Sequence, residues 1–170
     1  SALDLCAAPG GKTMQLAAAG WRVTAVDQSK KRLERLSDNL ARTGLDAQTV
    51  TADLRQWGPP APVEAILLDA PCSATGIYRR HPDVLHRIGP RQIGELAELQ
   101  APLLARAADW LTPGGRIVYA TCSLEQAEGE EQIARFLAAR PDFALLPIDS
   151  GELPQGMAAT AQGWLRTLPD

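Results

Sequence analysis

The sequence predicts an α/β fold, in which a doubly wound, mostly parallel sheet carries helices on both faces. Short apolar runs of strand length alternate with longer amphipathic runs along the chain, as in successive βαβ units. The run VEAILLDA at 63–70 is apolar almost throughout, which is typical of a parallel strand buried on both faces. The chain has 170 residues, enough for one domain with its own hydrophobic core.

Up to residue 70 the pattern predicts alternating strands and helices. The expected elements are a strand over 2–6, a helix over 12–19, a strand over 22–27, a helix over 29–43, and strands over 47–52 and 63–70. In the second helix Ser29 is a favourable N-cap, and Gly44 is the expected stop. Leu33, Leu36 and Leu40 share one face of that helix, so we expect this face to be buried.

The second half begins with a long loop that runs from the strand at 63–70 to Asp83. A helix is expected over 92–111, a turn over 112–115, a strand over 116–122 and a helix over 126–139. Beyond Pro141, glycines and prolines interrupt the pattern, and only 164–168 resembles a late strand.

Composition and charge exclude several classes of protein. The 17 basic and 20 acidic side chains give a formal net charge of −3, and 45% of the residues are apolar. These values exclude a disordered or collagen-like chain, and no apolar stretch approaches the roughly 20 residues of a membrane span. A mildly acidic chain is not a free-standing nucleic-acid clamp, but it is compatible with an enzyme that grips nucleic acid through a second domain.

The cysteines argue against metal and disulfide frameworks. Cys6, Cys72 and Cys122 are odd in number and far apart, with no C-x-x-C pair and no histidine at ligand spacing. No basic and then apolar leader precedes Asp4. We therefore expect no bound metal, no membrane and a reducing, cytoplasmic setting.

The segment AAPGGKT at 7–13 predicts a site for a nucleoside cofactor. It lacks the first glycine of a P-loop and contains no G-x-G-x-x-G fingerprint. Its small residues let a ligand approach the backbone at a helix N-terminus, and Asp27, at a strand end, can accept from two ribose hydroxyls. S-adenosylmethionine fits such a site. The alternatives are a plain tight turn at Gly10-Gly11 and, for Asp53, a helix N-cap in place of an adenine contact.

Two cysteines follow neighbouring strands of the expected sheet. Cys72 lies in the loop that begins at Asp69, and Cys122 ends the next strand. A single free cysteine is usually a small buried hydrophobe, but two beside a cofactor turn favour a thiolate nucleophile. Such a thiolate needs a positive environment, which Lys12 and the pair Arg79-Arg80 can supply.

Three long segments resemble one known family. DLCAAPGGKT (4–13), DAPCSATGIYRRHPDV (69–84) and LTPGGRIVYATCSLEQAEGEEQIARFL (111–137) resemble the Sun/RsmB and nucleolar-protein family of S-adenosylmethionine-dependent RNA cytosine methyltransferases. The late GWLRTLPD (163–170) is similar to the family's G-x-x-R-x-x-P stretch, whereas Glu128-Gly129-Glu130 stands where Glu-Asn-Glu is more usual. The resemblance implies a Rossmann-like class I methyltransferase catalytic domain over residues 1–170.

The resemblance also implies roles for the reactive side chains. Cys122 is the expected nucleophile, Cys72 assists product release, and Asp69 stabilises the protonated adduct. In DNA cytosine methyltransferases the Pro-Cys cysteine, here Cys72, would be the nucleophile instead; the Thr-Cys-Ser at 121–123 favours Cys122. The base must leave its stack to reach such a site.

The remaining expectations concern the ligands. The expected cofactor-binding residues are Cys6, Ala7, Ala8, Pro9, Gly10, Gly11, Lys12, Asp27, Arg32, Asp53 and Asp69, and the expected RNA-binding residues are Arg79 and Arg80. We expect a monomer that acts on rRNA, or alternatively on tRNA. We also expect a fragment without the family's N-terminal RNA-binding region and last strand, which binds the cofactor but methylates RNA poorly. The competing hypotheses are a class I methyltransferase of a protein or small molecule, and a catalytically silent RNA-binding or assembly module.

Overall fold

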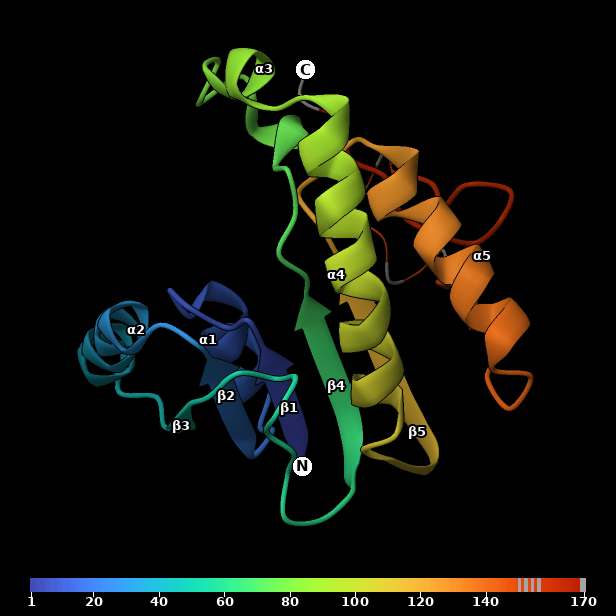
Figure 1. Cartoon of the computed structure of the whole chain (residues 1–170). Helices are drawn as coiled ribbons and strands as arrows, with labels where there is room; N and C mark the ends of the chain where they lie inside the picture. The colour runs from blue at the N-terminus through green and yellow to red at the C-terminus, as the bar shows by residue number, and fades with distance from the viewer. Residues whose placement is uncertain (150, 152, 154, 156, 169–170) are drawn as a thin grey trace.

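A five-stranded parallel sheet with helices on both faces forms the protein (Figure 1). The computed structural model describes residues 1–149, 151, 153, 155 and 157–168. The strand order is β3-β2-β1-β4-β5, and every neighbouring pair is parallel. The sequence order reverses between β1 and β4, and ligands of such sheets bind at that point, beyond the carboxyl ends of the strands. The predicted α/β architecture is therefore confirmed.

The first half of the chain builds one side of the sheet. Its elements are β1 (Ala2–Leu5), α1 (Gly11–Ala18), β2 (Val23–Asp27), α2 (Lys30–Thr43) and β3 (Gln48–Thr51). As predicted, the Ser29 side chain caps α2 by accepting from the backbone of Arg32, and Gly44 ends α2 at a φ of 66°. The three leucines at 33, 36 and 40 are buried, as their spacing predicted.

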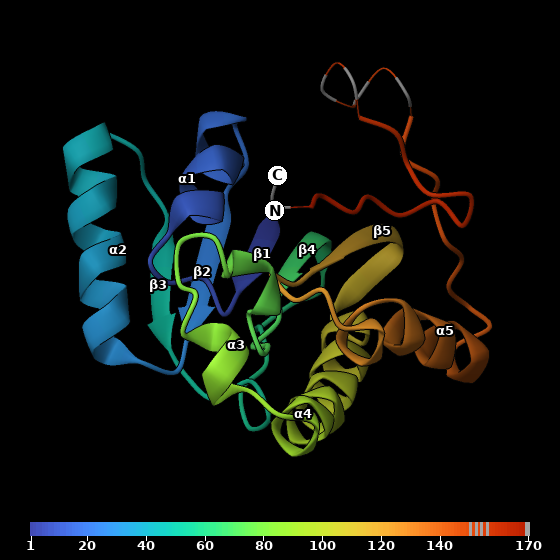
Figure 2. The same cartoon turned by 90° about the horizontal axis from the view of Figure 1, so that it is seen from above.

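The second half supplies the other side. Its elements are β4 (Val63–Asp69), η1 (Thr75–Ile77), α3 (Val84–Arg87), α4 (Pro90–Ala108), β5 (Leu111–Ala120), η2 (Gln126–Glu128) and α5 (Glu130–Ala139). The long loop expected up to Asp83 thus contains the short helix η1, and α3 follows it directly. Figure 2, from above, shows this connection crossing over the ends of the strands.

Four predicted elements differ from the structure. The helix predicted over 92–111 spans Pro90–Ala108, and Leu111 belongs to β5. The strand predicted over 116–122 spans Leu111–Ala120, because the expected turn is taken into the strand as an irregularity between the pairs Val63–Leu111 and Ala65–Arg116. The helix predicted over 126–139 is broken at Gly129 into η2 and α5. Residues 164–168 form no strand, and a backbone hydrogen bond from Thr160 to Trp164 closes a turn there instead.

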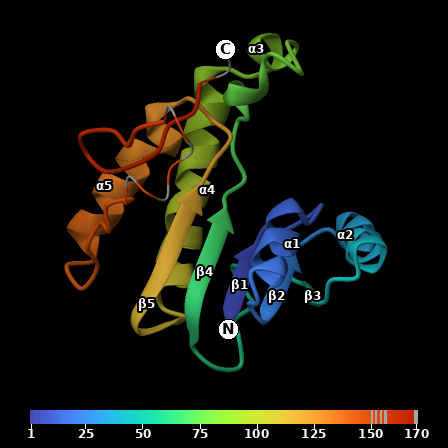
Figure 3. The ribbon, with the colours of Figure 1, turned by 180° about the vertical axis from the view of Figure 1, so that it is seen from behind.

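Alternation of side chains along β1 separates two hydrophobic cores. Leu3 and Leu5 join the core that includes Leu103 and Leu104 of α4 on one face. On the other face, Ala25 of β2 packs with the buried leucines of α2. Figures 1 and 3, taken from opposite sides, show α4 in front of the sheet and α1 behind it, and then the reverse. Among the described residues, each helix is too short or too polar to cross a bilayer.

Candidate active site

The carboxyl ends of the strands bring the predicted site residues to one edge of the sheet. Register pairs align Leu5 of β1 with Leu68 of β4, and Asp69 of β4 with Ala120 of β5. The loop after β1, Asp69 and Cys122 therefore all emerge at the same edge, although they lie far apart in the sequence.

The loop from β1 to α1 is an open backbone cradle. It has left-handed backbone at Cys6 (φ 60°) and Gly10 (φ 101°), and Gly10 N–H donates to the Ala7 carbonyl at 2.8 Å. A Cβ on Gly10 would lie 2.6 Å from Cγ of Leu36, whereas one on Gly11 would meet nothing within 4 Å. No side chain caps the N-terminus of α1. The N–H groups of this first turn donate to no side-chain cap, and such a helix N-terminus suits the carboxylate of an amino-acid moiety.

Asp27 holds this cradle against α2. Its buried carboxylate accepts from the backbone N–H of Ala8 at 3.2 Å and of Ser29 at 2.9 Å. Arg32 pairs with the same carboxylate at 3.6 Å and donates to the Ala8 carbonyl. Asp27 and Arg32 thus fix the shape of the predicted cofactor loop.

Asp53 is engaged by a neighbouring side chain. Its Oδ1 accepts from the backbone N–H of Arg55 at 2.9 Å, and its Oδ2 lies 2.6 Å from the Arg55 guanidinium. These hydrogen bonds with Arg55 lower the pKa of Asp53 to about 2. No helix follows Asp53 directly, so the expected helix N-cap is not found; Asp53 instead begins a turn over residues 53–57, and the adenine contact stays a prediction.

Asp4 lies beneath the cradle and was not among the predicted site residues. It is fully buried, and Thr13 donates to its Oδ2 at 2.5 Å, while Oδ1 has no partner among the described residues. Burial raises the pKa of Asp4 to about 6, against the opposing hydrogen bond from Thr13. An unpartnered buried acceptor under a backbone cradle fits a site that awaits a donor. The signal in the sequence was an acid inside the apolar strand ALDL.

An ion pair connects the cradle to the cysteine region. Lys12 Nζ lies 2.7 Å from Oδ2 of Asp69, and both side chains are partly exposed. The pair joins the first turn of α1 to the end of β4. The pKa of the Cys122 thiol is lowered mainly by its hydrogen bond with Cys72, and the Lys12 ammonium adds a smaller effect in the same direction.

The two cysteines face each other across the loops that follow β4 and β5. Their sulfur atoms are 3.4 Å apart, with Cys122 exposed and Cys72 partly buried. The hydrogen bond from the Cys72 thiol lowers the pKa of Cys122 to about 7, and the same interaction, together with burial, raises the pKa of Cys72 well above its ordinary value. Cys122 therefore ionises first, and Cys72 keeps its proton.

The loop with the predicted RNA-binding residues is attached to Cys122. Gly76 donates from its backbone N–H to the Cys122 carbonyl at 2.9 Å, and a Cβ on Gly76 would lie 2.8 Å from that oxygen. Arg79 and Arg80 follow and are exposed. Within the part of the chain that the structure describes, no ion pair engages either arginine.

Glu128 is a second residue that the sequence reasoning did not assign. It is fully buried, and its carboxylate accepts hydrogen bonds from the Ser73 backbone at 2.9 Å, from Gln100 at 3.0 Å and from the Ser123 hydroxyl at 2.6 Å. The stretch QAEGEE around it is typical of an exposed helix start, so only the serines after the two cysteines could have pointed to it.

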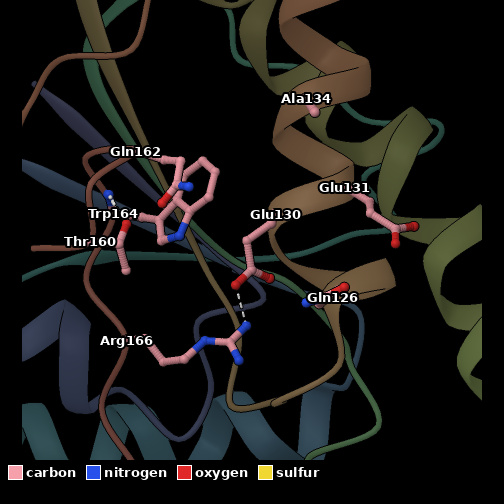
Figure 4. Close-up of a pocket in the computed structure, with 8 residues that line it drawn as sticks. All are labelled: Gln126, Glu130, Glu131, Ala134, Thr160, Gln162, Trp164 and Arg166. Atoms are coloured by element: carbon pink, nitrogen blue, oxygen red, sulfur yellow. Dashed lines mark hydrogen bonds and ion pairs between the residues drawn. The ribbon is translucent and has the colours of Figure 1, made fainter.

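A separate pocket lies between α5 and the segment 160–166, outside the cysteine region (Figure 4). Its volume is about 510 Å³, and its lining includes Trp164 and Arg166, which forms an ion pair with Glu130. Across the described residues, no group of three His, Cys, Asp or Glu side chains could hold a metal ion.

Comparison with curated proteins finds relatives of this chain. Ribosomal RNA small subunit methyltransferase B of Klebsiella pneumoniae (strain 342) is 49% identical over 148 residues, which are 84% of this chain and 34% of that protein. The chain therefore spans about a third of the length of this curated relative.

Two solved structures share the fold. A methyltransferase homolog protein from Pyrococcus horikoshii is 34% identical, with a TM-score of 0.74 over 96% of this chain and 51% of that one. NSun6 from Pyrococcus horikoshii, solved with SFG, is 28% identical, with a TM-score of 0.81 over 96% of this chain and 41% of that one. These matches confirm the Rossmann-like class I methyltransferase fold.

The sequence model of the family described as 16S rRNA methyltransferase RsmB/F matches residues 1–170. Membership in a methyltransferase family confirms the predicted cofactor, S-adenosylmethionine, whose site the open cradle and the unpartnered Asp4 oxygen fit. The resemblance inferred from the three sequence segments is thereby confirmed, and the chain belongs to the RsmB/F methyltransferase family.

Proposed function

We propose that this chain is the catalytic domain of an enzyme that transfers a methyl group from S-adenosylmethionine to carbon 5 of a cytosine in RNA, most directly rRNA. The observation that carries this proposal is the pair of cysteines 3.4 Å apart beside the cofactor cradle. Methylation of nitrogen or oxygen needs no thiol nucleophile, whereas carbon 5 of cytosine does. The name of the Klebsiella relative, a ribosomal RNA methyltransferase, supports RNA as the substrate.

The chemistry requires a thiolate because carbon 5 of cytosine is too electron-poor to attack a methyl sulfonium. Addition of the Cys122 thiolate at carbon 6 forms an enamine whose carbon 5 is nucleophilic. The cofactor supplies the electrophilic methyl group. After transfer, a base removes the proton from carbon 5, the electrons of that bond form the 5,6 double bond again, and the Cys122 sulfur leaves carbon 6.

The two cysteines divide these steps. Cys122 is exposed and has a pKa of about 7, so a large fraction of it is thiolate at neutral pH. Cys72 holds its proton against the Cys122 sulfur before addition, and once that sulfur is bound to carbon 6, Cys72 is free to assist product release. Asp69 lies beside both the cradle and the cysteines and would hydrogen-bond the N3/N4 edge of the base.

The other expected residues serve the ligands. The loop from Cys6 to Lys12 would bind the amino-acid end of the cofactor through its backbone, and Asp27 with Arg32 would keep that loop in shape. Arg79 and Arg80 would contact RNA phosphates at the rim, where they are exposed and attached through Gly76 to Cys122.

The test is a covalent trap with RNA that contains 5-fluorocytidine, whose fluorine cannot be removed as a proton is. With S-adenosylmethionine, we expect an RNA–protein adduct that survives denaturation, is absent in Cys122→Ala and persists in Cys72→Ala. Omitting the cofactor is the control, because the trap closes only after methyl transfer. An adduct that depends on Cys72 alone would reverse the two roles, and no adduct with 16S rRNA or tRNA would overturn the cytosine-5 proposal.

A further inference from the structure

The two cysteines are each followed by a serine, and both serines bind one buried carboxylate. Ser73 follows Cys72, Ser123 follows Cys122, and both donate to Glu128 through their hydroxyls. The two hydroxyl oxygens are 3.1 Å apart, and the Ser73 backbone N–H also donates to Glu128 at 2.9 Å. We call Ser73, Ser123 and Glu128 the serine–glutamate bridge. It joins the two cysteine loops side chain to side chain.

The bridge is itself held by the core of the protein. Gln100 of α4 is fully buried and donates to Glu128 at 3.0 Å and to the Pro71 carbonyl at 2.9 Å. Tyr119 of β5 donates through its hydroxyl to the backbone carbonyl of Glu128 at 2.8 Å. The glutamate is thus fixed against α4 and β5 by contacts that do not involve the serines.

A buried carboxylate is a costly way to hold a fold together. Glu128 is fully buried, and none of the ion pairs among the described residues includes it. Burying such a charge is tolerated only when hydrogen bonds surround it, and apolar packing would join the same segments at lower cost. The arrangement therefore calls for a role beyond packing.

The sheet alone does not fix the cysteine pair. The last register pair between β4 and β5 is Asp69 with Ala120, and both cysteines lie beyond it. Backbone hydrogen bonds from Ala70 to Ala120 and from Gly76 to Cys122 continue the contact, and the Cys72 sulfur accepts from backbone N–H groups, including that of Cys122. These bonds bring the loops together, and the bridge adds the side-chain connection directly after each cysteine.

We propose that Glu128 is a positioning residue, which sets the 3.4 Å distance between the Cys72 and Cys122 sulfur atoms by accepting hydrogen bonds from Ser73 and Ser123. Only the effect of this distance on catalysis rests on the proposed function. The distance itself is a property of the folded chain without RNA. At this distance the Cys72 proton can bond the Cys122 sulfur, so the bridge also controls which cysteine ionises.

The hydrogen-bond inventory predicts which substitution is tolerated. In Glu128→Gln, the amide oxygen can accept from the Ser73 backbone and Gln100, and the amide nitrogen can donate to the two serine hydroxyls, which accept as well as donate. In Glu128→Ala, the same donors lose their shared acceptor and the loops separate. If the negative charge of Glu128 set the sulfur–sulfur distance, both variants would lose the short contact. If its hydrogen bonds set the distance, only Glu128→Ala would lose it.

The experiment measures disulfide closure between the two cysteines in this chain, with diamide as oxidant. Two thiols become a disulfide while diamide is reduced to its hydrazine, and mass spectrometry follows the loss of two hydrogens. We expect closure to be slower by about tenfold or more in Glu128→Ala, because a displacement of about 1 Å can cost that much. Glu128→Gln and the control Glu131→Ala, which alters an exposed acid of α5, should close at nearly the parental rate.

A second readout is the pH dependence of Cys122 alkylation by iodoacetamide. The groups that act on Cys122 are Cys72, Asp69 and Lys12, and no variant alters them. In the parent the midpoint should lie near pH 7, and in Glu128→Ala it should move up toward the ordinary thiol value of about 8.5. Glu128→Gln should restore the parental midpoint, which a mere loss of packing would not predict.

Thermal unfolding and S-adenosylmethionine binding establish that each variant is folded. If Glu128→Ala does not fold, Ser123→Ala removes one arm of the bridge and should slow closure on its own. Parental closure rates in a folded Glu128→Ala, or in both Ser73→Ala and Ser123→Ala, would overturn the proposal. Because no RNA is present, failure of this test and failure of the 5-fluorocytidine trap are independent.

Discussion

Asp4 is expected to make the folded chain less stable as the pH rises from acid to neutral. Burial raises the pKa of this carboxyl from 3.8 to about 6. Between these values the folded chain keeps a proton that the unfolded chain has released, so the free energy of unfolding falls as the pH rises through this window. A shift of about two pKa units corresponds to about 3 kcal/mol, which is fully lost above the folded-state pKa.

Substitution by asparagine isolates this contribution. Asp4→Asn keeps the shape of the side chain and does not titrate, and Thr13 can still donate to the amide oxygen. The contribution of carboxyls that do not act on Asp4, such as Asp53 with its lowered pKa, cancels in the difference. The unfolding free energy of the variant minus that of the parent should therefore rise by about 3 kcal/mol between about pH 3.5 and 7.5.

Urea unfolding followed by tryptophan fluorescence measures this difference at each pH. The rings of Trp57 and Trp110 are packed edge to face against the core, with their centroids 5.5 Å apart. Their emission therefore reports the unfolding of that core. The matched control is Asp38→Asn, an exposed acid of α2, whose difference from the parent should stay flat. A flat difference for Asp4→Asn, or one that falls as the pH rises, would refute the reasoning.

Three further predictions concern the backbone and the charges of the site. Gly10→Ala should lower the free energy of unfolding by about 1–3 kcal/mol and weaken S-adenosylmethionine binding in calorimetry, because a Cβ there would lie 2.6 Å from Leu36. The control Gly20→Ala has a positive φ as well but open space around the Cβ, so it should leave binding unchanged. Lys12→Met should shift the midpoint of Cys122 alkylation to higher pH, because the ammonium lowers the pKa of that thiol; an unchanged midpoint would contradict this. Gly76→Ala should abolish the RNA adduct while cofactor binding persists, because its Cβ would lie 2.8 Å from the Cys122 carbonyl oxygen; a normal adduct yield would show that the contact is dispensable.

The parallel sheet could be predicted because its signals are local. Apolar runs such as 63–70, the N-cap at Ser29 and the leucine spacing of α2 depend only on neighbouring residues. The errors came where distant contacts decide. The glycine-rich segment 112–115 is a turn by composition, but β4 pairs with the residues on both sides of it and draws it into β5. The expected strand at 164–168 finds no partner strand among the described residues.

In the candidate site, too, local signals could be predicted and long-range contacts could not. Parallel strands end at one edge, so the sequence predicted that the cradle, Asp69 and the two cysteines would meet there. It did not predict that Asp53 begins a turn and pairs with Arg55, because that depends on the direction in which the Arg55 side chain turns. Nor could it single out Glu128 from its acidic neighbours, because the serine that it binds at position 73 belongs to another strand end.

The mutual hydrogen bond of the two cysteines and their unequal burial push their pKa values apart. Both are thiols at the ends of neighbouring strands, and neither the residue type nor the position along a strand distinguishes them. Once the sulfurs are 3.4 Å apart, only one thiol can donate into the contact, so the more exposed Cys122 gains the hydrogen bond and the lower pKa, while partly buried Cys72 retains its proton. A change that separates the sulfurs removes the hydrogen-bond part of this asymmetry, so the pKa of Cys122 should rise, while burial still raises the pKa of Cys72. On the proposed function, the roles of nucleophile and helper therefore depend on the distance between the two sulfurs, and the residues proposed to fix that distance matter as much as the cysteines do.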